Sequence, residues 1–191
     1  EKTIISPVES AVSYLITVPL QIWFIFWLLR RRKIDLSKNL GLYHFNRNAL
    51  IYSLVAYLIL YLVLTAYSYA FQISPPEEFI KLMQATPFVL NFLMVVIGAP
   101  IVEELLFRGF LFSQLKTTKL GINGSIILTS LIWTSIHLQY DLFLLIPIFL
   151  IGLLLGYLMH KYNSLYLVII VHAVHNLQAT LFIEFFYDYF Y

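Results

Sequence analysis

Long apolar segments alternate with short polar ones along the whole chain. A helix that crosses a bilayer needs about 20 mostly apolar residues. Six segments approach that length: residues 11–29, 49–73, 87–115, 123–138, 142–159 and 165–184. Proline, glycine, asparagine and aspartate gather between them, as is typical of turns. The pattern predicts an all-α fold, a polytopic transmembrane helix bundle with about six spanning helices.

The composition supports the same class. Hydrophobic residues make up 61% of the 191 residues and charged residues 12%, whereas soluble domains average about 45–50% and about 25%. The chain has no cysteine, which excludes thiol nucleophiles, disulfides and cysteine-ligated metal centres. A net charge of +2 provides no basic surface for nucleic acid. We therefore expect the lipid bilayer, and not nucleic acid, as a partner.

The basic residues predict the orientation, because lysine and arginine accumulate in cytoplasmic connections. Nine of the twelve lie in the connections that follow the first, third and fifth apolar segments: Arg30, Arg31, Arg32, Lys33, Lys38, Arg47, Lys116, Lys119 and Lys161. Only Lys2 and Lys81 lie on the opposite side, and Arg108 lies inside a span. We expect a multi-pass protein of the cell membrane with both ends of this chain outside.

A few polar and ionisable residues lie inside the expected spans, where they are costly and indicate function. They are Glu103, Glu104 and Arg108 in the third span, His137 in the fourth, and His172, His175 and Asn176 in the sixth. At a rise of about 1.5 Å per residue, Glu103, His137 and Asn176 lie roughly 18–20 Å from the basic ends of their helices, and His172 about 12 Å. The similar depths predict a polar site between helices three, four and six.

The spacing of these residues within each helix predicts different roles for them. Glu104 and Arg108 are four residues apart, so they face the same way and are expected to form an ion pair. Glu103 is rotated by about 100° from Glu104 and stays free to act as a base. His172 and Asn176 are also four residues apart, which suits a histidine oriented beside an amide donor.

Two local features leave alternatives open. Pro100 cannot donate a hydrogen bond to the carbonyl of Val96, so the helix is expected to loosen just before the carboxylates, with or without a functional consequence. Gly152 and Gly156 form a Gly-x-x-x-Gly pattern that permits close helix packing. This packing would occur either within the chain or between chains.

The polar set favours hydrolysis of a peptide bond within the membrane. A desolvated glutamate beside histidines can take a proton from water. Histidine and asparagine donors can then hold the oxyanion that forms when the water attacks an amide. Two carboxylates and two imidazoles would also accommodate zinc with an open position for water. We expect no cofactor, with zinc as the alternative.

Three motifs, in this order, resemble the CPBP or Abi family of intramembrane endopeptidases. That family joins type II CAAX prenyl endopeptidases with bacteriocin-processing and immunity proteins. Its Glu-Glu-x-x-x-Arg motif corresponds to residues 103–108, and its His-x-x-x-Asn motif to residues 172–176. Its Phe-x-x-x-His motif corresponds to residues 133–137, with Trp133 in place of phenylalanine. The resemblance extends over about residues 87–180.

The resemblance implies an endopeptidase whose site opens toward the cytoplasm and whose substrate is a peptide or protein, with or without a lipid. The implied catalytic residues are Glu103, which would activate water, and His137, His172 and Asn176, which would act beside it. Glu104 and Arg108 would be supporting residues. A metal, if present, would be held by Glu103, His137 and His172. His175 is not a motif position.

Two other functions remain open at this stage. A proton- or ion-coupled carrier would use the same glutamate and histidines as a relay, although the paired repeats usual in transporters are missing from the sequence. A non-proteolytic immunity or scaffold protein would need the fold but not Glu103. In each case we expect one integral membrane domain, with residues 1–86 as an N-terminal region of two spans and residues 87–191 as a CPBP-like catalytic bundle.

Overall fold

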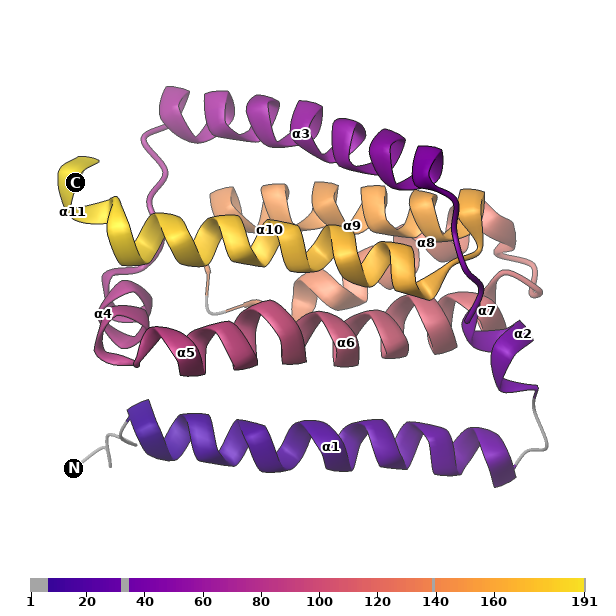
Figure 1. The fold of residues 1–191 in the computed structure, drawn as a ribbon. Helices are drawn as coiled ribbons and strands as arrows, with labels where there is room; N and C mark the ends of the chain where they lie inside the picture. The colour runs from indigo at the N-terminus through magenta and orange to yellow at the C-terminus, as the bar shows by residue number, and fades with distance from the viewer. Residues whose placement is uncertain (1–6, 32–34, 139, 191) are drawn as a thin grey trace.

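The computed structural model describes residues 7–31, 35–138 and 140–190, which form a bundle of long antiparallel helices (Figure 1). The helical elements are α1 (Pro7–Arg31), α2 (Leu36–Leu40), α3 (Arg47–Ala70), α4 (Glu77–Ala85), α5 (Phe88–Asn91), η1 (Phe92–Gly98), α6 (Ala99–Glu104), η2 (Leu105–Leu111), α7 (Phe112–Leu115), α8 (Gly121–Ser135), α9 (Leu142–Tyr162), α10 (Leu165–Phe185) and α11 (Tyr187–Phe190). The fold is 84% helical, and the described residues contain no strand. The all-α prediction is confirmed.

The long helices lie in layers (Figure 1). The elements from α5 to α7 join end to end into one continuous helix, here called the third span. It lies between α1 on one side and α10 on the other, and α3 covers α9 and α10 from the far side. Both ends of the described chain lie at the same end of the bundle, opposite α2 and the last turn of α1. The basic last turn of α1 and the basic connections after α7 and α9 share that opposite end, so the polarity that the charges predict has a counterpart in the fold.

Polar side chains begin three of the long helices. The carboxylate or side-chain oxygen of Asn46, Asp141 and Ser164 accepts a hydrogen bond from a backbone N–H in the first turn of α3, α9 and α10, respectively. These caps satisfy donors that would otherwise lack partners inside the helix. The turn residues between the apolar segments therefore set where the spans start.

Five helices of the described residues are long and apolar enough to cross a membrane, against the prediction of about six spans. They are Val12–Arg31, Arg47–Ala70, Phe88–Leu115, Leu142–Tyr162 and Leu165–Phe185. The expected fourth span ends earlier, because α8 has 15 residues. At about 1.5 Å per residue it reaches about 22 Å, short of the roughly 30 Å hydrocarbon core. His137 consequently lies in the turn after α8 and not on a helix.

The local cause of this early end involves His137 itself. In a continuing helix its backbone N–H would bond to the carbonyl of Trp133, but it bonds instead to Thr134, at 3.0 Å. The ring Nδ1 of His137 forms a hydrogen bond with the free Trp133 carbonyl instead, at 2.9 Å. Because a carbonyl only accepts, this bond places the imidazole proton on Nδ1. The side chain thus replaces the next helical hydrogen bond and stops the helix.

The third span loosens where Pro100 predicted. The backbone N–H of Ala99 bonds to the carbonyl of Met94, five residues back, in the π-helical segment η1. A second π-helical segment, η2, follows Glu104 directly. Single π turns inside α-helices are frequent at functional sites. The two carboxylates lie between these two wide turns.

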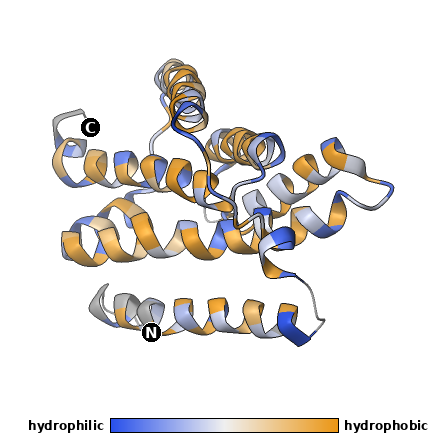
Figure 2. Ribbon diagram, turned by 45° about the vertical axis from the view of Figure 1, so that its right-hand side comes forward, coloured by the Kyte–Doolittle hydropathy of each residue, from blue (hydrophilic) through white to orange (hydrophobic). Residues whose placement is uncertain are grey.

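The Gly-x-x-x-Gly pattern packs within the chain. A methyl group at Gly152 would lie 3.0 Å from Cβ of Ser130, and one at Gly156 would lie 3.0 Å from Cγ2 of Ile126. The two glycines therefore let α9 approach α8 closely. Apolar residues extend along the whole length of the long helices (Figure 2). Many large side chains point away from the bundle, among them Trp23, Leu58, Leu62 and Ile59, as expected for surfaces that face lipid.

Candidate active site

The site contains a fully buried ion pair between Glu104 and Arg108. Arg108 Nη1 donates to Glu104 Oε1 at 2.8 Å, and both side chains are fully buried. Arg108 Nη2 donates to the carbonyl of Gly152 at 3.0 Å, and its guanidinium carbon lies 4.9 Å from the centre of the Trp133 ring. The expected ion pair is therefore present, and it ties the third span to α8 and α9. Each contact partly offsets the cost of burying charge.

His172 connects this ion pair to the second carboxylate. Its Nδ1 lies 2.9 Å from Glu104 Oε1, and its Nε2 lies 4.0 Å from Glu103 Oε2. Glu104 is paired with Arg108 and accepts hydrogen bonds as a carboxylate, so Nδ1 of His172 is the protonated nitrogen. The unprotonated Nε2 then faces Glu103 across a gap too long for a direct hydrogen bond.

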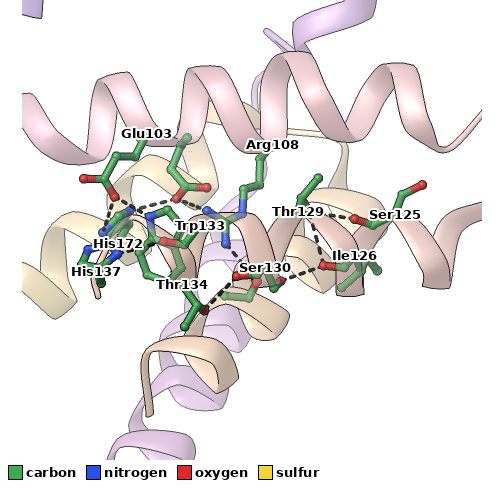
Figure 3. Close-up of polar contacts among 12 residues, drawn as sticks. Glu103, Arg108, Ser125, Ile126, Thr129, Ser130, Trp133, Thr134, His137 and His172 are labelled. Carbon is green, nitrogen blue, oxygen red and sulfur yellow. Dashed lines mark hydrogen bonds and ion pairs between the residues drawn. The ribbon is translucent and has the colours of Figure 1, made fainter. Parts of the chain in front are cut away.

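Trp133 is a site residue that the sequence interpretation missed. Its indole N–H donates to Glu103 Oε2 (Figure 3). Its ring packs edge to face with His137 and His172, with centroids 5.2 and 5.3 Å away. The available signal was the substitution itself, because tryptophan at the Phe-x-x-x-His position brings a donor that phenylalanine lacks. One side chain therefore contacts Glu103, Arg108 and both histidines.

Four of the predicted residues lie together, with one change in how they are positioned. Glu103, Arg108, His137 and His172 converge around Trp133 (Figure 3). The change concerns His137, which joins the cluster from the turn after α8 and whose ring Nδ1 is occupied by the Trp133 carbonyl. Its Nε2 is the nitrogen left for chemistry.

Asn176 faces the third span at a position that Pro100 explains. Its side-chain N–H donates to the carbonyl of Val95 at 2.8 Å. In the π-helical segment the carbonyl of Val95 would receive the backbone N–H five residues later, which is the position of Pro100, and proline has none. Asn176 thus supplies the missing donor. One amide hydrogen is used in this way, and the second remains for another acceptor.

His175 points to a different neighbour. Its ring Nδ1 lies 3.2 Å from the hydroxyl of Tyr57 on α3, and that hydroxyl also donates to Gln178, at 3.1 Å. Gln178 in turn donates to the hydroxyl of Tyr61, at 3.0 Å. The contacts of His175 therefore link α10 to α3 and not to Glu103.

An apolar cleft of about 630 Å³ reaches Glu103 from the side of α1. Tyr14, Gln21, Phe24 and Ile25 form its α1 wall, and the third span forms the opposite wall from Val102 to Phe110. Glu103 lines this cleft with 21% of its side chain exposed. Of the two adjacent carboxylates, one is therefore enclosed by its partners and the other faces open space.

Glu103 and His172 are engaged in hydrogen bonds with neighbouring side chains. Within residues 7–31, 35–138 and 140–190, no three histidine, aspartate or glutamate side chains gather closely enough to hold a metal ion. Trp133 donates to the very oxygen of Glu103 that faces His172, and His172 Nδ1 is engaged by Glu104. This arrangement orients Glu103 and His172 toward hydrogen bonding.

About half of the chain is similar to a family of known proteins. Residues 85–178 match the family described as type II CAAX prenyl endopeptidase Rce1-like. Residues 85–178 belong to this family. The matched region contains all three motifs, from Glu103 to Asn176, and leaves α1 and α3 outside it. Comparisons with curated proteins and with solved structures gave no significant match.

The family of residues 85–178 indicates the general function of this region. The Rce1-like region is that of a CAAX-type intramembrane protease, which acts on a peptide or protein substrate. Together with the five apolar helices of the described residues, this region indicates a multi-pass membrane protein, and its family implies membrane endopeptidase activity.

Proposed function

We propose that this protein hydrolyses peptide bonds by a glutamate-activated water and without a metal, with Glu103 as the base. The observation that carries the proposal is the contrast between the two adjacent carboxylates. Glu104 is ion-paired with Arg108 and hydrogen-bonded to His172, whereas Glu103 lines the cleft. A base must reach both a water molecule and the substrate, and of these two carboxylates Glu103 has that access.

The gap between Glu103 and His172 suits the attacking water. Two acceptor atoms 4.0 Å apart can both receive hydrogen bonds from one water placed about 2.8 Å from each. Glu103 takes a proton as the water oxygen attacks the substrate carbonyl carbon. The protonated Glu103 then gives that proton to the leaving amine as the carbon–nitrogen bond breaks. Glu104 keeps His172 in the required tautomer, as the carboxylate partner of a catalytic histidine does.

The oxyanion would be held by the other two motif residues. The candidate donors are the second side-chain N–H of Asn176 and the Nε2–H of His137 in its doubly protonated imidazolium form. Both side chains are already oriented by a backbone carbonyl, of Val95 and of Trp133 respectively. Donors that are fixed in advance stabilise a developing charge without reorganisation. Arg108 supports the site by neutralising Glu104.

The shape of the cleft supports a substrate that enters from the cytoplasmic side of the cell membrane. From Glu103, its lining continues along the third span to Phe110 and along α1 to Ile25, toward the basic end of the bundle. The walls are largely apolar, which suits a prenyl group attached to a peptide as well as the aliphatic residues of a CAAX sequence. We therefore propose a lipid-modified peptide or protein as substrate.

The experiment compares wild type with Glu103→Gln in detergent, using fluorogenic CAAX peptides that are identical except for farnesylation of the cysteine. We expect cleavage by wild type, none by Glu103→Gln, a preference for the farnesylated peptide, and no effect of a strong zinc chelator. Loss of activity with the chelator would overturn the metal-free mechanism. Cleavage retained by Glu103→Gln would overturn the role of Glu103, and binding without cleavage would favour a scaffold protein.

A further inference from the structure

The cleft beside Glu103 has an unexpected source of polar groups on α1, which lies outside the matched family region. Seven of its ten lining residues are apolar, and the three others are Glu103, Tyr14 and Gln21. Tyr14 and Gln21 are seven residues apart on α1, which places them two turns apart on one face of the helix. Both point to the same space as the proposed base.

A peptide in this cleft would need such groups. Each residue of an extended substrate carries one N–H and one carbonyl, which lose their water when the peptide enters an apolar environment. Unpaired peptide groups are costly there. A tyrosine hydroxyl and a glutamine amide each donate and accept hydrogen bonds, so they can pair with either peptide group. The apolar lining residues offer no side-chain partner.

The packing at Gly98 holds Tyr14 against the third span. A Cβ atom at Gly98 would lie 3.1 Å from Cε1 of Tyr14 and 3.8 Å from its hydroxyl oxygen. The absence of a side chain at Gly98 therefore makes room for the Tyr14 ring two residues before Pro100, on the cleft that Glu103 also lines. Tyr14 lies at the catalytic end of the cleft, and Gln21 lies farther toward the basic end.

The spacing of the two side chains matches a short stretch of extended peptide. Seven residues of α-helix rise about 10.5 Å, and an extended chain advances about 3.3 Å per residue. Tyr14 and Gln21 are therefore separated by about three substrate residues.

We infer that Tyr14 and Gln21 on α1 form a substrate-binding wall that hydrogen-bonds the peptide backbone on the side of the cleft opposite Glu103. The inference rests on the proposed peptidase function. Tyr14 contacts the peptide beside the scissile bond, and Gln21 contacts it about three residues nearer the basic end. The helix that precedes the family region thus completes the substrate site.

The test uses variants that remove only the hydrogen-bonding groups: Tyr14→Phe, Gln21→Leu and the double variant. Thr17→Val is the matched control, because Thr17 is exposed on the same helix and its hydroxyl bonds to a backbone carbonyl of α1. The substrate is the fluorogenic farnesylated CAAX peptide. Binding of the same peptide is measured by fluorescence anisotropy in a Glu103→Gln background, where no turnover occurs.

A neutral hydrogen bond corresponds to about a three- to tenfold effect. We expect Gln21→Leu to raise KM by about that factor with kcat unchanged, and Tyr14→Phe to lower kcat/KM by a similar factor. The double variant should weaken binding in the Glu103→Gln background by about 10- to 100-fold if the two effects add. Thr17→Val should change neither quantity, and the apparent Tm of all four variants should match wild type.

The outcomes separate this inference from the proposed function. If wild type cleaves the peptide and both α1 variants behave like Thr17→Val, the binding wall is wrong and the role of Glu103 stands. If binding falls in the α1 variants, the binding wall is supported whatever the rate of cleavage. A peptide that wild type neither cleaves nor binds overturns both.

Discussion

Two polar clusters lie between the helices of this protein, and both include a histidine of α10. The first, here called the acid cluster, consists of Glu103, Glu104, Arg108, Trp133 and His172. The second, the tyrosine cluster, consists of Tyr57, Tyr61, His175 and Gln178. His172 and His175 are only three residues apart, yet one faces the third span and the other faces α3.

The clusters differ in charge and in how well their groups are paired. The tyrosine cluster is built from hydroxyl, amide and imidazole groups that bond to one another in a chain. In the acid cluster, Glu104 Oε2 and Arg108 Nε are buried and have no hydrogen-bond partner among the described residues. Hydrogen bonds between membrane helices contribute only about 0.6–2 kcal/mol, whereas a charge at depth costs about 2.5 kcal/mol or more. The tyrosine cluster therefore suits helix association, and the acid cluster suits chemistry.

The largest effect should come from the base. Glu103→Gln keeps the size of the side chain and removes its ability to take a proton, so cleavage of the farnesylated peptide should fall by about 10³-fold. The apparent Tm should stay close to that of wild type, because Glu103 is partly exposed. Glu78→Gln, on the exposed side of α4, is the control. A loss of less than tenfold would show that the acid cluster is structural.

Arg108→Met should be the most destabilising change. It leaves Glu104 buried without its cation, which typically costs about 3–5 kcal/mol in the free energy of unfolding. Adding Glu104→Leu should restore most of that free energy, because an apolar pair replaces the ion pair. The double variant should remain inactive, since His172 has lost its carboxylate partner. Denaturation in mixed micelles measures the first effect and peptide cleavage the second; an active double variant would refute the role of Glu104.

Trp133→Phe should have an intermediate effect. The substitution keeps a ring between the histidines and removes the N–H that holds Glu103, and hydrogen bonds to charged groups contribute about 1.5–3 kcal/mol. We expect kcat/KM to fall by about 10- to 100-fold with little change in Tm. Trp23→Phe, on the exposed face of α1, controls for the loss of a tryptophan. An unchanged rate would mean that Glu103 is oriented by other contacts.

The smallest effect should come from the tyrosine cluster. Tyr57→Phe removes the hydroxyl that joins His175 to Gln178 and should lower the free energy of unfolding by about 0.6–2 kcal/mol. Peptide cleavage by the folded protein should not change. Tyr52→Phe, exposed on the same helix, should alter neither quantity. A large loss of activity in Tyr57→Phe alone would extend the catalytic region to α3 and remove the contrast between the clusters.

Local spacing carried much of the site prediction. The ion pair between Glu104 and Arg108 follows from four residues of separation within one helix, whatever surrounds it. The loosened helix before the carboxylates follows from the missing N–H of Pro100. The approach of His172 to Glu103 was expected from the depths of these residues along neighbouring spans, and the membrane class follows from composition. These inferences concern single helices or the chain as a whole.

Contacts between helices could be decided only by the tertiary structure. The indole of Trp133 reaches Glu103 because Gly152 and Gly156 let α9 pack closely against α8, which sets the position of α8 beside the third span. The donor that Asn176 supplies to Val95 depends on the register of α10 against η1.

The sequence by itself determined a helical membrane protein with a paired and an unpaired carboxylate. It could not determine that α8 stops at Ser135, since apolar residues continue beyond it. The hydrogen bond from the His137 side chain to the Trp133 carbonyl, which replaces the next helical bond, is visible only in the structure. Nor could the sequence determine that α1 lines the cleft, because large apolar residues such as Ile25 and Trp23 occur both on the cleft-facing side and on the exposed side of that helix. In a membrane, hydrophobicity places a helix in the bilayer but does not orient its faces. Close packing and a few polar contacts orient them, and these exist only once the helices have assembled.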